Sequence, residues 1–135
     1  MKFVLDTNVF SEMMKGNAKV LSRLRSIPKS DVSVPQPVLA EIAYGIERLP
    51  KAKRRDRLSE RHARISEELP RAPWTDDVTA HFGEIKAALE RRGERIEDFD
   101  IAIAAHARAA NAVLVTANAS HMDRVEGLRV EDWTF

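Results

Sequence analysis

The 135-residue sequence predicts a single α/β domain, residues 1–135, built around a parallel sheet. Short apolar runs typical of buried strands alternate with longer segments of helical periodicity, which is the pattern of strands joined by crossover helices. The length suits one packed core, because two domains of half this size would each be only marginally stable.

The chain begins with a predicted strand and helix. Lys2–Leu5 is a short apolar run, as expected of a buried strand. Asp6 and the two residues after it are N-cap residue types, so a helix is expected to begin here and run to about Lys15, before Gly16. The next predicted elements are a helix at Ala18–Ser26 and a β-branched strand at Asp31–Val34.

Two helices are expected in the middle of the chain. Pro35 and Pro37 open the first, whose apolar residues recur at helical spacing, and Pro50 ends it. Lys51–Leu69 is predicted to be a charged helix. Its segment 51–64 carries seven basic residues against two acidic ones, a net charge of +5. This segment is either a solvated helix face or a surface for RNA phosphates.

The C-terminal half continues the alternation of helices and strands. A turn or short strand is expected first, then two helices, a buried strand and a last edge strand, with Asn111 in the left-handed conformation after the second helix. The ranges are Pro70–Trp74, a helix from Thr75 that ends before Gly93, Glu97–Ala110, Ala112–Thr116 and Leu128–Trp133.

The composition excludes several classes of protein. The formal net charge is +1, so neither a strongly basic tail nor a polyacidic one is the main feature. The absence of cysteine excludes a disulfide scaffold and a thiolate zinc site. No apolar run is long enough to span a bilayer, and Asp6 comes too early for a signal peptide, so we expect a cytoplasmic protein.

Three acidic residues occupy positions where a carboxylate is unusual. Asp6 stands where the first strand ends, at the edge where α/β sheets bind ligands, although it also suits an N-cap. Glu41 borders the buried stripe of its helix, where a carboxylate is costly unless it is paired, bound to a metal or turned out to solvent. Asp100 lies near a helix N-terminus, a place for which Glu97 and Asp98 compete.

Three converging carboxylates would repel one another, and hard divalent cations such as Mg²⁺ or Mn²⁺ relieve that repulsion. A metal in such a site activates water for attack on a phosphate, which is the chemistry of a phosphodiesterase. Thr116 and Asn118 follow a predicted strand at the same edge, and Asp123 is an alternative to Asn118 as a fourth group.

Four motifs and a terminal tryptophan resemble those of PIN-domain proteins, and in particular of the VapC-type toxin ribonucleases of type II toxin–antitoxin modules. The resemblance extends in order along the whole chain. The matching segments are Phe3–Val9, Val38–Gly45, Asp100–Ala107, Leu114–Met122 and Trp133.

The resemblance implies a three-layer fold, with a central parallel sheet of four to five strands flanked by helices. It also implies an endoribonuclease dependent on Mg²⁺ or Mn²⁺, which Asp6, Glu41 and Asp100 would hold. Asn118 falls where relatives carry Asp or Asn. Because its side chain is neutral, the resemblance is compatible with either one or two metal ions. Thr7 and Thr116 match hydroxyl positions that orient water or substrate.

The same resemblance implies a cognate antitoxin, an RNA substrate and a small homodimer. The alternative hypothesis is a PIN-like module that binds protein or RNA without catalysis. Three clustered acids argue against it, because a binding module does not need them.

Overall fold

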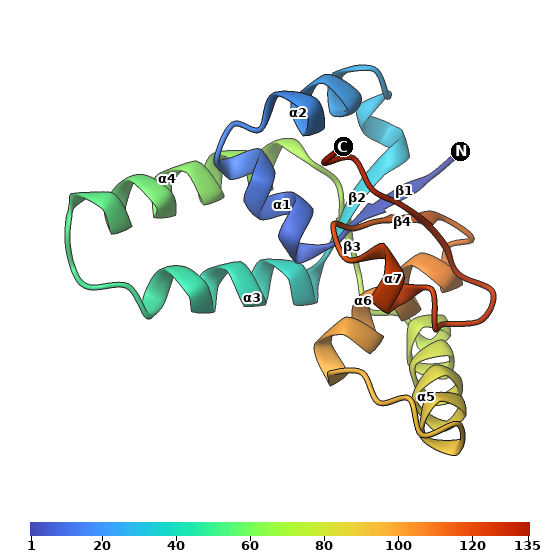
Figure 1. Ribbon diagram of the computed structural model, residues 1–135. Helices are drawn as coiled ribbons and strands as arrows, with labels where there is room; N and C mark the ends of the chain where they lie inside the picture. The colour runs from blue at the N-terminus through green and yellow to red at the C-terminus, as the bar shows by residue number, and fades with distance from the viewer.

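The structure, a computed structural model of residues 1–135, has five parallel strands flanked by helices (Figure 1). The strand order across the sheet is β3-β2-β1-β4-β5, and every neighbouring pair is parallel. The predicted parallel α/β fold is therefore confirmed. The strands are β1 (Phe3–Leu5), β2 (Val32–Pro35), β3 (Arg71–Ala72), β4 (Val113–Val115) and β5 (Arg129–Glu131).

Seven α-helices accompany the sheet, and six of them lie where the sequence predicts them. They are α1 (Thr7–Met14), α2 (Ala18–Arg25), α3 (Gln36–Glu47), α4 (Lys53–Glu68), α5 (Asp76–Arg91), α6 (Asp98–Ala109) and α7 (Ala119–Met122). Asn111 is left-handed after α6, as expected, with φ of 52°.

Two details differ from the prediction. Pro35 is the last residue of β2 and the N-cap of α3 rather than a residue of the helix, whereas Pro37 lies in its first turn. The four-residue helix α7 was not predicted, because so short a segment shows no helical periodicity.

The register of the sheet brings the ends of β1 and β4 to the same edge. Phe3 pairs with Val113 and Leu5 with Val115, so both strands end at one level. Asp6 and Thr116, the residues that follow them, therefore lie at the carboxyl edge of adjacent strands, where α/β sheets bind ligands.

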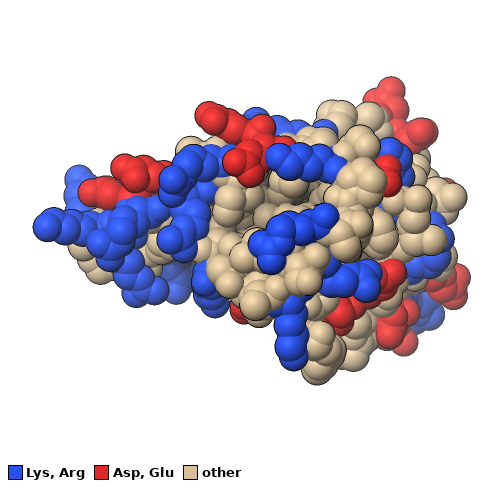
Figure 2. Space-filling view, turned by 90° about the horizontal axis from the view of Figure 1, so that it is seen from above, with Lys and Arg blue, Asp and Glu red and all other residues tan.

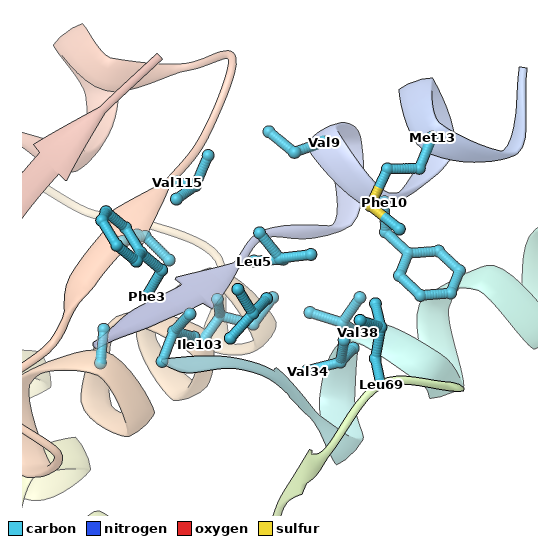
Figure 3. Packing of buried hydrophobic residues seen from close by; sticks show 14 of the residues in the cluster. Phe3, Leu5, Val9, Phe10, Met13, Val34, Val38, Leu69, Ile103 and Val115 are labelled. Carbon is cyan, nitrogen blue, oxygen red and sulfur yellow. The ribbon is translucent and has the colours of Figure 1, made fainter. Parts of the chain in front are cut away.

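Two apolar clusters hold the fold together. The larger surrounds β1 and extends to α1 and α3, and Figure 3 shows Phe10 with Val38 and Leu69 on one side of it. The smaller lies mainly between α5 and α6. Phe10 is fully buried, and it anchors α1 in the larger cluster immediately after the carboxyl edge.

Helices α3 and α4 form a hairpin that projects away from the sheet (Figure 1). The hairpin is joined at residues 48–52, between the end of α3 and the start of α4. None of the helices combines the length and the hydropathy that crossing a bilayer requires.

Replacing Phe10 with alanine is expected to lower the free energy of unfolding by about 3–5 kcal/mol, because it empties a fully buried site in the larger cluster. The control is Phe135→Ala, at a terminal residue that is 91% exposed, with an expected change within about 0.5 kcal/mol. Urea denaturation followed by circular dichroism measures both. Equal losses would show that α1 is not anchored through Phe10.

Candidate active site

Asp6 lies at the carboxyl end of the central strand and also begins a helix. Its backbone N–H donates to the Val115 carbonyl oxygen at 2.9 Å, which aligns the ends of β1 and β4. Its Oδ1 accepts a hydrogen bond of 2.7 Å from the Thr7 backbone N–H, and only 3% of the residue is exposed. Asp6 is therefore both the N-cap of α1 and a buried carboxylate at the ligand-binding edge.

Glu41 reaches the same edge from α3. The Thr7 hydroxyl donates to Glu41 Oε1 at 2.5 Å, which links the first turn of α1 to the middle of α3. The glutamate is half-buried, as expected for a residue at the border of the buried stripe. Thr7 thus fixes the orientation of one carboxylate oxygen of Glu41.

Asp100 approaches from the first turn of α6. The one basic side chain at ion-pair distance is His121, whose Nε2 lies 3.9 Å from Asp100 Oδ2. Burial raises the pKa of Asp100 to about 6, and the negative charges of Asp6 and Glu41 contribute in the same direction. The three carboxyl groups therefore sense one another electrostatically, and we call Asp6, Glu41 and Asp100 the carboxylate site.

Asp6 responds to the same surroundings. Burial raises its pKa, and the charge of Glu41 acts in the same sense. Hydrogen bonds from Thr116 and from the Thr7 backbone act in the opposite direction, as does His121. Burial is the largest of these influences, so ionising Asp6 costs free energy in the folded protein.

The donor set of the carboxylate site suits a hard divalent cation. It consists of carboxylate oxygens, and no lysine or arginine forms an ion pair with any of them. The three groups are nevertheless not arranged as a ready metal cage, since no group of three acidic or histidine side chains is placed to hold an ion. Ligation by all three requires the side chains to move toward a common centre, against a repulsion that a cation relieves.

Asn8 and Thr116 bind the end of β4 to α1. Asn8 Nδ2 donates to Thr116 Oγ1 at 3.4 Å, and Asn8 Oδ1 accepts from the Ala117 backbone N–H at 3.0 Å. Thr116 Oγ1 also accepts from the Asn118 backbone N–H at 3.0 Å. These bonds hold the loop after β4 against the first turn of α1, beside the carboxylate site.

The side chain of Asn118, the fourth predicted site residue, is not held in place by hydrogen bonds. Asn118 is the exposed N-cap residue of α7, and its side-chain amide makes no hydrogen bond. Its alternative Asp123 is exposed at the end of α7. Asp98, the competitor of Asp100, forms an ion pair with Lys86 at 3.0 Å.

Two residues at the site were not singled out from the sequence. His121 is the only basic side chain at ion-pair distance from Asp100. Asn8 was interpreted only as a helix-start residue. The available signals were the spacing of His121, one helical turn after Asn118, and that of Asn8, two residues after Asp6.

A comparison with protein families decides the classification. The sequence profile of the PIN domain matches residues 3–128, which is nearly the whole chain. The chain belongs to the PIN-domain family. The carboxyl edge described above is therefore the corresponding edge of a PIN domain.

Relatives of similar length share about a third of their residues with this PIN-domain chain. The tRNA(fMet)-specific endonuclease VapC of Shigella flexneri is 30% identical, over 99% of both chains. Ribonuclease VapC2 of Haemophilus influenzae is 33% identical, over 98% of both chains.

Solved structures agree with the sequence matches. The DNA-bound VapBC complex of Salmonella typhimurium has a chain with a TM-score of 0.89 and 29% identity, covering 98% of both chains. VapBC2 of Rickettsia felis, bound to a promoter DNA fragment, has a TM-score of 0.88 and 28% identity, covering 98% of this chain and 99% of that one. These matches confirm the predicted family, fold and ribonuclease-toxin class.

The raised pKa of Asp100 predicts a pH-dependent penalty on stability. Between about pH 4 and pH 6 the folded state holds more protons than the unfolded state, so stability falls as the pH rises through this range. Asp100→Asn removes the charge and is expected to stabilise the protein in EDTA by about 1–3 kcal/mol at pH 7.

Urea denaturation across this pH range checks the prediction, and the gain should vanish below about pH 4. Glu67→Gln, at an exposed residue of α4 without an ion-pair partner, is the matched control and should change stability little at any pH. A stability gain for Asp100→Asn that is the same at every pH would contradict the electrostatic explanation.

Proposed function

We propose that this chain is an endoribonuclease toxin of a type II toxin–antitoxin pair, hydrolysing RNA phosphodiester bonds at the carboxylate site. The observation that carries the proposal is the electrostatic coupling of Asp6, Glu41 and Asp100 at the carboxyl edge. A non-catalytic binding module would bear the cost of burying these charges without using them. The names of the relatives, a tRNA(fMet)-specific endonuclease among them, support the same reading.

We further propose that the carboxylate site holds Mg²⁺ or Mn²⁺ through Asp6, Glu41 and Asp100. A divalent ion bound there would supply Lewis acidity and lower the barrier to attack by water. The chain's own part is to position the oxygens: Thr7 orients Glu41, and β1 and α6 fix the backbone at the other two residues. The hydroxyl of Thr116 and the amide of Asn118 lie at the end of β4, where they would orient water or substrate.

The purified chain is expected to cleave RNA with Mg²⁺ or Mn²⁺ and to lose this activity in EDTA. Asp6→Asn and Asp100→Asn should each reduce cleavage about a hundredfold or more, because each removes a negative charge at nearly constant shape. Transfer RNA is the first substrate to test, given the relatives' names. Gel analysis of the cleaved RNA measures the activity, and growth arrest on expression should disappear with the same two variants.

Controls separate a loss of chemistry from a loss of fold. Glu67→Gln, outside the site, should retain cleavage, and circular dichroism should show all variants folded. Mn²⁺ should raise the melting temperature of the parent protein more than that of Asp6→Asn. An ion that binds the folded state stabilises that state, and the variant lacks one of the proposed ligands. Cleavage that persists in EDTA, or in folded Asp6→Asn, would refute the proposed mechanism.

A cognate antitoxin is proposed as the partner, and a homodimer as the toxin assembly. A groove of about 240 Å³ runs between α1, α3 and α4. Thr7 and Glu41 lie at one part of its wall, Ser11 and Lys15 also line it, and an apolar part is formed by Met14, Ile42, Ile46, Leu49 and Leu58. An apolar segment of the antitoxin would fit this groove and place a basic side chain against the negative carboxylate site. Relatives of this chain have been solved in VapBC complexes, which supports an antitoxin partner here.

Ile46→Glu is expected to weaken binding of the antitoxin, because it buries a charge in the aliphatic part of the groove. Co-expression with the proposed antitoxin, followed by copurification, measures the effect. Ile46→Val is the control and should retain the complex. Light scattering on the purified toxin and on the complex reports whether each contains two toxin chains. Unchanged copurification of Ile46→Glu would place the partner elsewhere.

A further inference from the structure

The hairpin of α3 and α4 carries a concentration of positive charge that the carboxylate site does not explain. We define the basic arm as residues 44–64, which hold eight basic residues and three acidic ones, a net charge of +5. The whole chain has a net charge of +1, so the remainder of the molecule has a net charge of −4. The excess of positive charge therefore lies within residues 44–64 of the hairpin, whose projection from the sheet Figure 1 shows.

Most cations of the basic arm have no partner within the protein. Arg55 pairs with Glu47 at 2.7 Å, and Arg61 donates to the Met14 carbonyl oxygen at the end of α1. The remaining lysines and arginines form no ion pair, and Figure 2 shows basic side chains covering the narrow end of the molecule. These unpaired residues are Arg48, Lys51, Lys53, Arg54, Arg57 and Arg64. An ion-pair network that stabilises the helix is therefore not their role.

The basic residues of α4 form a stripe along one side of the helix. At 100° per residue, positions 53, 54, 57, 61 and 64 fall within an arc of about 100°. Asp56 and Glu60 lie outside this arc, about 60° and 20° beyond its edge at Lys53. A continuous stripe of like charge on a helix matches the repeating phosphates of a nucleic-acid backbone.

An exposed aromatic ring lies on α3, between Glu41 of the carboxylate site and the end of the helix that leads to α4. Tyr44 is 67% exposed and follows Glu41 by three residues on α3, about one helical turn. The Arg48 guanidinium lies over its ring, 5.9 Å from the centroid. An exposed ring next to unpaired cations is the combination that proteins use to stack a base while contacting the adjoining phosphates.

We propose that the basic arm binds a single-stranded part of the RNA substrate, with a base stacked on Tyr44 and the following phosphates along the stripe of α4. This inference rests on the proposed ribonuclease function and adds a substrate path to it. Charge separation within the chain favours RNA as the ligand, because a negatively charged body would repel a polyanion unless a positive element received it. The position of Tyr44, one turn beyond Glu41, joins this path to the carboxylate site.

Binding is measured with a short, unstructured, fluorescein-labelled RNA by fluorescence anisotropy. All proteins carry Asp6→Asn so that the RNA remains intact. The arm variant is Lys53→Gln/Arg54→Gln/Arg57→Gln, at three exposed residues without hydrogen bonds or ion pairs of their side chains. Its matched control is Lys19→Gln/Arg25→Gln/Lys29→Gln, which removes the same charge from α2 and the segment before β2. Circular dichroism verifies that both proteins remain folded.

The arm variant is expected to bind RNA about tenfold or more weakly, whereas the control binds nearly as well as the parent. A plot of the logarithm of the binding constant against the logarithm of salt concentration has a negative slope. In the arm variant this slope should be shallower by about 2, at about 0.7 for each lost phosphate contact. Equal losses in both triple variants would overturn the proposal, because they would report total charge and not the arm.

Tyr44 is tested separately because stacking and charge have different signatures. Tyr44→Ala should weaken binding about fivefold or more without changing the salt slope, and Tyr44→Trp should retain binding. A loss of affinity in Tyr44→Trp as large as that in Tyr44→Ala would overturn the stacking role.

The outcomes distinguish this inference from the proposed function. If the protein with Asp6 restored cleaves RNA but the arm variant binds RNA normally, the arm inference fails and the nuclease function stands. If the arm variant loses RNA binding while the restored protein cleaves no RNA with Mg²⁺ or Mn²⁺, the arm inference stands and the nuclease function fails. An arm variant that keeps RNA binding but loses the antitoxin would identify the arm as a protein-binding surface and overturn the proposal.

Discussion

The repulsion among three carboxylates at one edge of the sheet is the constraint on which the rest of the site depends. Asp6, Glu41 and Asp100 come from three different elements, and the fold brings them within electrostatic reach of one another. The larger cluster around β1 and the packing of α6 hold these elements in place against that repulsion. The hydrophobic core thus stabilises a polar arrangement that is unfavourable by itself.

Much of the fold follows from local patterns in the sequence. The apolar run before Asp6, the prolines at the start of α3 and the alanine-rich segment at α6 each predict an element close to its observed bounds. The site acids are recognisable for the same reason: each stands at a strand end, a helix border or a helix start where a carboxylate needs an explanation. Motif resemblance then supplies the family, which the profile match confirms.

Other features depend on contacts between distant residues, and local patterns do not contain them. The strand order, with β1 between β2 and β4, follows from packing across the sheet. His121 approaches Asp100 only because α7 turns back after β4, and a four-residue helix has no periodicity to detect. The path of the unpaired cations is likewise a property of the projecting hairpin, since net charge alone does not show which side chains lack partners.

The order of the strands also has a consequence for synthesis on the ribosome. Leu5 pairs with Val115, far along the chain, and β5 completes that side of the sheet. A nascent chain that stops before β4 already contains all three acids but lacks the strand that aligns Asp6 with Thr116. A product truncated there therefore has no assembled edge, and the carboxylate site forms only after β4 has been synthesised.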